Sequence, residues 1–154
     1  MPQRPPFETL FRTSPNAYLL LDRDLVILDA NEAYLRLTSR ALEDIVGQRI
    51  HEAFAADPQA TETSHVDELL ESFARVLRSK AADTLPIIRY SIAVSPTGGA
   101  PHQDRYWSAT HTPVLDERGE VTAILQHTVD ITELQTLKAS LRSAEIGGQP
   151  LQQI

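Results

Sequence analysis

The sequence contains no cysteine among its 154 residues. Disulfide bonds, thiolate nucleophiles and cysteine-ligated metals are therefore excluded, and so is a flavin photoreceptor whose chromophore reacts with a cysteine thiol. No apolar run approaches the roughly 20 residues that a membrane-spanning helix needs. The segment Met1–Pro6 also lacks the apolar core of a signal peptide. These absences predict a cytoplasmic location and no membrane contact by this segment.

Basic residues are in the minority, because 14 lysines and arginines stand against 21 aspartates and glutamates, for a net charge of -7. A protein that neutralises nucleic-acid phosphates or anionic lipids needs a basic face, so neither is expected as a partner. What the chain does contain is 42% hydrophobic and 23% charged residues. That composition and length predict one domain with a sizeable core.

The hydrophobic pattern changes between strand-like and helical periods along the chain. It predicts strands at Ala17–Leu21, Leu25–Leu28, Ile87–Ser95, Arg105–Leu115 and Glu120–Val129. It predicts helices at Phe7–Thr13, Glu32–Thr38, Arg40–Val46, Ile50–Phe54 and Val66–Ser79, with a last helix that ends at Gly147-Gly148. A strand pair and a strand trio separated by helices predict an α+β domain: one five-stranded antiparallel sheet with short helices over one face.

In the last helix, apolar residues recur at alternating steps of three and four, which is a coiled-coil seam of under two heptads. Its members are Leu134, Leu137, Leu141 and Ala144. We expect this seam, with Phe7, Leu10 and Phe11 of the first helix, to form a homodimer interface. Packing of the seam onto the domain's own sheet is the alternative. The preceding Asp130-Ile131-Thr132 predicts a helix cap, through which movement of the sheet would reach the helix.

Catalytic and metal-binding patterns are absent from the sequence. It has no G-x-S-x-G elbow, no H-E-x-x-P phosphoacceptor motif and no glycine-rich ATP loop, so no catalytic residue is assigned and an enzyme is not expected. The histidines form no i,i+4 helical pair and no His-x-His, which disfavours a metal site: His51, His65, His102, His111 and His127. A haem needs an axial histidine beside its pocket, and His51 and His65 are the candidates adjacent to predicted helices.

Several short motifs occur in a characteristic order. They are F-x-x-L-F-x-x-S-P at Phe7–Pro15, A-N-E-A-Y at Ala30–Tyr34, Thr112-Pro113-Val114, Gly119-Glu120-Val121 and Asp130-Ile131-Thr132-Glu133. Together they resemble a PAS domain, and most closely the PAS modules of bacterial sensor histidine kinases. The resemblance runs from about Phe7 to about Leu134.

The resemblance implies a PAS fold with sheet order 2-1-5-4-3, a small pocket between sheet and helices, and dimerisation through flanking helices. The expected division is a flanking helix at 1–14, the PAS domain at 15–130, a signalling linker helix at 131–146 and a tail at 147–154. The output domain of the two-component system is expected outside this chain. Three functions stay open: sensing of an unknown small molecule, dimerisation without a ligand, and haem-based sensing of gas or redox state.

Alternation along the strands predicts which side chains face the pocket, because successive residues point to opposite faces of a sheet. We assign Ser108 and Thr110, together with Ile124, Gln126 and Thr128, to the pocket. The opposite face, with Trp107, Ala109, Leu125 and Val129, is expected under the first helix and a partner chain. The surrounding elements are expected to add Tyr34, Phe54, Phe73, Leu77 and Tyr90.

Overall fold

The computed structural model describes residues 2–54, 64–93 and 102–147. Its strands are β1 (Ala17–Asp22), β2 (Ile27–Ala30), β3 (Asp83–Ala93), β4 (His102–Leu115) and β5 (Val121–Asp130). Its helices are α1 (Phe7–Thr13), α2 (Glu32–Thr38), α3 (Leu42–Ile45), α4 (Ile50–Ala53), α5 (Ser64–Ser79) and α6 (Thr132–Gly147). The five antiparallel strands lie in the order β2-β1-β5-β4-β3, which confirms the predicted topology. Of the predicted tail, residues 148–154 lie outside the described part.

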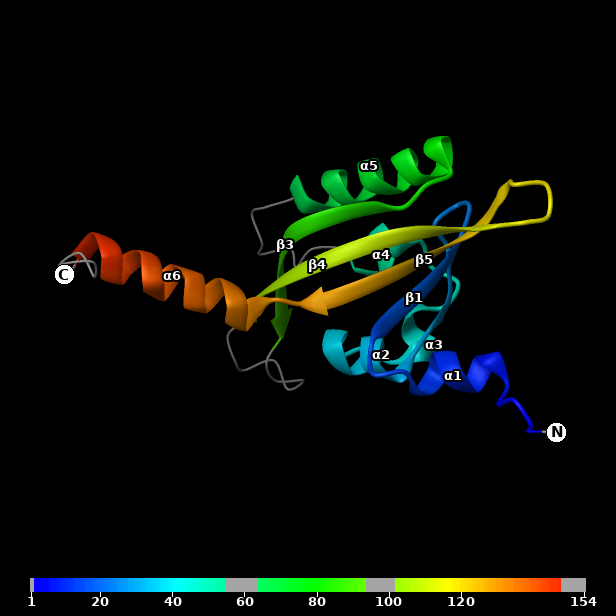
Figure 1. Cartoon of the computed structure of the whole chain (residues 1–154), viewed down its shortest axis with the longest axis horizontal. Helices are drawn as coiled ribbons and strands as arrows, with labels where there is room; N and C mark the ends of the chain where they lie inside the picture. Colours follow the sequence, from blue (N-terminus) through cyan, green and yellow to red (C-terminus); the bar gives the residue numbers. More distant parts are fainter. Residues whose placement is uncertain (1, 55–63, 94–101, 148–154) are drawn as a thin grey trace.

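Some helices pack against the sheet, whereas α6 projects away from it (Figure 1). Helix α5 packs along β3 and β4, while α2 packs against β1. Helix α6 continues from the end of β5 and projects away from the sheet, at the opposite end of the molecule from α1 (Figure 1). The chain therefore leaves the domain through a helix with few contacts to the body.

The core lies between one face of the sheet and the helices that cover it. Its fully buried side chains come from both halves of the chain and include Leu19, Leu21, Ile27, Ile45, Phe73, Val76 and Ile124. Removing such side chains from water is the main driving force for folding. The alternation in β1, where Ala17, Leu19 and Leu21 are buried and the residues between them are half-buried, identifies the core face of the sheet.

Asn31 joins three elements from a completely buried position. Its Oδ1 accepts hydrogen bonds from the backbone N–H of Tyr34 at 3.1 Å, which caps α2, and of Tyr18 in β1 at 3.0 Å. Its Nδ2 donates to the backbone oxygens of Phe11 at 3.0 Å and of Asn16 at 2.7 Å. One side chain thus satisfies backbone groups of α1, β1 and α2 that burial would otherwise leave unpaired.

Helix α1 is also held to the domain by an ion pair. The Arg12 guanidinium donates to both carboxylate oxygens of Asp29, at 3.0 and 2.9 Å, and to the backbone oxygen of Ala30 at 2.9 Å. The Phe11 ring also stacks on Tyr18, with 6.2 Å between ring centroids. Phe7 stays 78% exposed and Leu10 48% exposed, so the apolar face of α1 is only partly covered.

Several predicted boundaries differ from the structure by a few residues, and at β2 and β3 the reason is local. Strand β2 begins at Ile27 and not at Leu25, because Leu25 adopts the left-handed φ of 66° inside the hairpin turn. Strand β3 begins at Asp83 and not at Ile87, because the edge strand continues through Pro86, with a register shift between Leu85 and Ile88. Proline is tolerated in edge strands and bulges, since its missing N–H interrupts no inner ladder.

Candidate functional site

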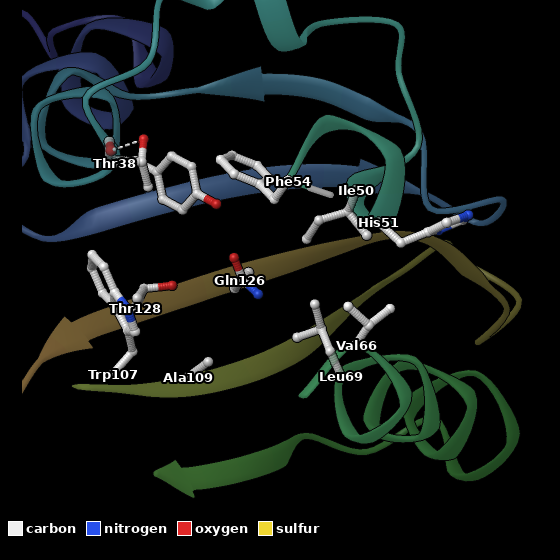
Figure 2. A pocket seen from close by; sticks show the side chains of 11 residues that line it. Thr38, Ile50, His51, Phe54, Val66, Leu69, Trp107, Ala109, Gln126 and Thr128 are labelled. Carbon is white, nitrogen blue, oxygen red and sulfur yellow. Dashed lines mark hydrogen bonds between the residues drawn. The ribbon is translucent and has the colours of Figure 1, made fainter. Parts of the chain in front are cut away.

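A cavity of about 110 Å³ lies between the sheet and helices α2, α4 and α5 (Figure 2). Its sheet wall consists of Trp107 and Ala109 from β4 and of Gln126 and Thr128 from β5. Its helical wall is formed by Tyr34, Thr38, Ile50, His51, Phe54, Val66 and Leu69. This volume is below the roughly 300–1,000 Å³ of pockets for drug-sized ligands, so the cavity in this conformation suits a molecule of a few heavy atoms.

Four residues assigned to the pocket from the sequence do line this cavity: Tyr34, Phe54, Gln126 and Thr128. Phe73, Ile124 and, less deeply, Leu77 belong to the adjoining hydrophobic core instead. The side chain of Tyr90 lies outside the part of the chain whose side chains are described. The prediction therefore identified the cavity's position, and it included core residues because apolar pocket and core side chains share the same sequence pattern.

The predicted face of β4 is wrong. Residues opposite each other in an antiparallel pair share a face, and Ala109 pairs with Thr128 whereas Thr110 pairs with His127. Trp107 and Ala109 are therefore on the cavity side and almost completely buried, while Ser108 and Thr110 are on the outer face. Ser108 there donates to the backbone oxygen of Leu85, at 3.4 Å.

Two polar atoms at the cavity wall lack a partner among the residues that the structure describes. They are the indole Nε1 of Trp107 and the Nδ1 of His51, both buried from water. A buried polar group without a hydrogen bond costs free energy. A ligand that supplies the missing hydrogen bond at the cavity wall removes this cost and so binds more tightly. The sequence prediction missed Trp107 as a pocket residue, although its size and apolar body already favour burial over exposure.

A buried polar network reaches the cavity along the same face of the sheet, because His111 pairs with the cavity residue Gln126. The imidazole of His111 is fully buried, with its ring centroid 4.1 Å from that of Phe73. Its Nδ1 lies 2.7 Å from Ser72 Oγ, and its Nε2 lies 3.0 Å from Nε2 of the cavity residue Gln126. Burial lowers the pKa of His111 from 6.5 to about 4, so the ring is neutral at neutral pH.

The network continues from Ser72 to an ion pair at the edge of the sheet. Ser72 Oγ donates to an Asp83 oxygen at 2.5 Å, and the Arg75 guanidinium donates to both Asp83 oxygens, at 3.2 and 2.9 Å. The hydrogen bonds from Arg75 and then Ser72 hold the pKa of Asp83 below its usual value. Residues 72, 75, 83, 111 and 126 thus form one continuous chain of polar contacts.

The described part of the cavity wall contains almost no charge. Its lining residues in the described part of the chain include no aspartate, glutamate, lysine or arginine, and one histidine, His51. The guanidinium of Arg40 lies 4.9 Å from the ring centroid of Phe54, but Arg40 does not line the cavity. In the described residues, no group of three or more histidine or acidic side chains could hold a metal ion. Of the two histidines predicted as candidates for an axial haem ligand, His51 lines the cavity. The side chain of the other, His65, lies outside the described part of the chain.

The junction between β5 and α6 is hydrogen-bonded to the strand that forms the cavity wall. Tyr106 N–H donates to Thr132 Oγ1 at 3.0 Å, and the Tyr106 backbone oxygen accepts from Ile131 N–H at 2.8 Å. Asp130 Oδ1 accepts from Thr132 N–H at 2.9 Å and so caps the first turn of α6. Because Tyr106 directly precedes Trp107, the cavity wall and the helix junction share one stretch of strand.

The apolar seam of α6 does not pack onto the domain's own sheet. Leu134, Leu137 and Leu141 are 49%, 56% and 54% exposed. Nor is any helix among the described residues long and apolar enough to cross a membrane. The seam is therefore available on the outside of the molecule.

Comparison with solved structures finds the same fold in the PAS domains of other proteins, at low sequence identity. The PAS domain of BvgS from Bordetella pertussis is 20% identical, with a TM-score of 0.61 over 92% of this chain and 95% of that one. The PAS domain of nitrogen regulation protein NR(II) from Vibrio parahaemolyticus is 19% identical, with a TM-score of 0.58 over 83% and 100%. A PAS domain in complex with ethanol, from a LuxR-family transcriptional regulator of Burkholderia thailandensis, is 16% identical, with a TM-score of 0.58 over 82% and 98%.

No curated protein sequence matches the chain. A family model described as the PAS fold, however, matches residues 11–136. This match takes in both halves of the sheet, the cavity and the beginning of α6. The protein therefore belongs to the PAS fold family.

Proposed function

We propose that this PAS domain is a sensory module that binds a small molecule in the cavity and passes its occupancy to α6 within a homodimer. The observation that carries the proposal is the shared strand segment: Trp107 lines the cavity, and its neighbour Tyr106 holds the start of α6. A ligand that moves the indole also acts on the two hydrogen bonds at the junction. It can shift α6 only to the extent that it binds one arrangement more tightly than the other.

The unpaired Nε1 of Trp107 supports ligand binding over a role in dimerisation alone. In a domain that only dimerises and binds no ligand, we expect apolar side chains to fill this space at the packing density of a protein interior. Here the wall keeps an open volume of about 110 Å³ and two buried polar atoms that have no partner in the described part of the chain. The ethanol complex of the related fold shows that a PAS domain can hold a molecule of this size.

The exposed seam of α6 supports the homodimer. Three half-exposed leucines at coiled-coil spacing leave an apolar stripe in water, and a parallel partner helix would cover it. Because α1 lies at the other end of the molecule (Figure 1), its exposed Phe7 forms a separate patch that contributes independently of α6. The proposed arrangement makes residues 15–130 the sensor and 131–146 the linker to an output domain, as in a cytoplasmic histidine kinase.

Ligand entry can be followed through Trp107, because it is the only tryptophan of the chain. Propan-1-ol, propionamide and propionate are titrated separately while indole fluorescence is recorded, and native mass spectrometry tests for a co-purified small molecule. We expect saturable fluorescence changes with at least one probe. Ligand sensing is contradicted if none of the three probes changes the indole fluorescence and the purified protein has the mass of the polypeptide alone.

Coupling to α6 is tested with Thr132→Val, which removes the hydrogen bond from Tyr106 N–H. We expect the probe to bind as before while no longer altering hydrogen exchange in α6. Thr136→Val is the matched control, because Thr136 is an exposed residue of the same helix whose hydroxyl donates only to the backbone oxygen of Thr132. Equal transmission in both variants would show that the junction does not carry the coupling.

A further inference from the structure

The polar network beside the cavity fixes the direction of each hydrogen bond, starting from Asp83. Arg75 donates to both oxygens of this carboxylate, and the pKa of Asp83 is held low, so the group is ionised and can only accept. Ser72 has one hydroxyl proton and lies 2.5 Å from Asp83. That proton therefore points to Asp83, and the lone pairs of Ser72 Oγ face the other way.

The orientation of the Ser72 hydroxyl determines which nitrogen of His111 carries the proton. Ser72 Oγ lies 2.7 Å from Nδ1 of the imidazole and has no further proton to give, so His111 donates through Nδ1–H. A neutral imidazole has one N–H only, and the buried ring is neutral at pH 7. The Nε2 atom is consequently an unprotonated acceptor.

The acceptor Nε2 of His111 in turn fixes the orientation of the Gln126 side-chain amide. Its amide nitrogen lies 3.0 Å from the acceptor Nε2 of His111 and donates to it. The amide cannot rotate to exchange its two ends, because the carbonyl oxygen would then face a lone pair. Figure 2 shows the Gln126 oxygen on the side of Phe54, across the cavity, and the nitrogen turned away. This oxygen is therefore the end of the Gln126 amide that faces the cavity.

The cavity thus presents a fixed acceptor, Gln126 Oε1, and an unpaired donor, Trp107 Nε1–H, within a nearly uncharged wall. We propose that it selects small uncharged molecules carrying an O–H or N–H donor, such as short alcohols and primary amides, and rejects carboxylates of the same shape. This inference rests on the proposed ligand-sensing function. A carboxylate brings no donor for Gln126 and loses its hydration, and the described part of the wall has no lysine or arginine to replace it.

The first test reads the tautomer of His111 in the unmodified protein. Long-range ¹H–¹⁵N spectra at pH 7.5 distinguish a ring protonated at Nδ1 from one protonated at Nε2. We expect Nδ1–H in the protein as it stands and a mixture of tautomers in Ser72→Ala, which removes the acceptor. Protonation at Nε2 in the unmodified protein overturns the inference, because Gln126 would then turn its oxygen to His111 and its amide N–H groups to the cavity.

The second test compares the isosteric probes propionamide and propionate by Trp107 fluorescence and amide chemical shifts. We expect propionamide to bind at least about tenfold more tightly, and Gln126→Leu to remove about tenfold of its affinity, the usual effect of one lost hydrogen bond. Gln48→Leu, at an exposed position outside the cavity, is the matched control. Preference for propionate overturns this inference and leaves ligand sensing intact, whereas absence of binding by propionamide, propan-1-ol and propionate overturns both.

Discussion

Acidification is expected to destabilise this domain well above the pH at which carboxylates titrate, because of His111. The folded protein keeps this imidazole neutral until about pH 4, whereas in the unfolded chain its pKa is near the ordinary 6.5. Between these values the unfolded state binds one proton more than the folded state. Stability therefore falls as pH decreases, by about 1.4 kcal/mol per pH unit and by about 3 kcal/mol over the whole window.

The effect of Asp83 has the same sign, but it falls in a lower pH window, which allows the two to be separated. The pKa of Asp83 is lowered below its ordinary 3.8 on folding, so its stabilising contribution is complete above that pH and is lost only as pH falls further. The contribution of His111 is complete above pH 6.5 and is lost between pH 6.5 and pH 4. Measurements between pH 4.5 and pH 7.5 therefore isolate the histidine.

The assay is urea unfolding at closely spaced pH values, for the unmodified protein and for His111→Asn. The variant removes the titrating ring and retains a side-chain N–H donor. It is expected to be less stable at pH 7.5, because it leaves Ser72 or Gln126 without a full partner. Its stability should, however, depend less on pH, by about 1.4 kcal/mol per unit across the window. Equal slopes for both proteins would refute the claim that burial of His111 is linked to folding.

Two further outcomes follow from contacts described above. Asn31→Ala should lower the free energy of unfolding by about 3 kcal/mol in urea titrations, because it removes a helix cap and leaves buried backbone groups unpaired; a loss under about 1 kcal/mol would mean that water replaces the side chain. Leu137→Glu combined with Leu141→Glu should weaken dimerisation in light scattering without unfolding the domain, whereas Ala139→Glu with Ser143→Glu, on the opposite face of α6, should not. An unchanged dimer in the first variant would put the interface elsewhere.

The elements that sequence analysis located best are those with a local determinant. Helix α2 begins where predicted because Asn31 caps it, and α1 begins directly after Pro6. The predicted strand begins only after Pro86, at Ile87, whereas β3 begins at Asp83, and the position of β3 at the sheet edge explains why this proline is tolerated. Local rules therefore succeed where neighbours along the chain decide the structure.

The candidate site was predictable in position and not in chemistry. Gln126 and Thr128 were found by alternation along β5 alone. The face of β4 depends on its pairing with β5, which a single strand does not reveal. The contact of Ser72 with His111 joins residues 39 positions apart, and no spacing rule connects a helical serine to a histidine two strands later.

The length of α6, which has 16 residues, turns a small change of angle at Thr132 into a larger displacement at the far end of the helix. At 1.5 Å per residue the helix is about 24 Å long, so a tilt of about 10° at its first turn displaces its far end by about 4 Å. That displacement is close to half the usual distance between packed helices of 8–10 Å. A change at Tyr106 too small to disturb the sheet would therefore be enough, at the other end of α6, to separate two partner helices or to bring them together.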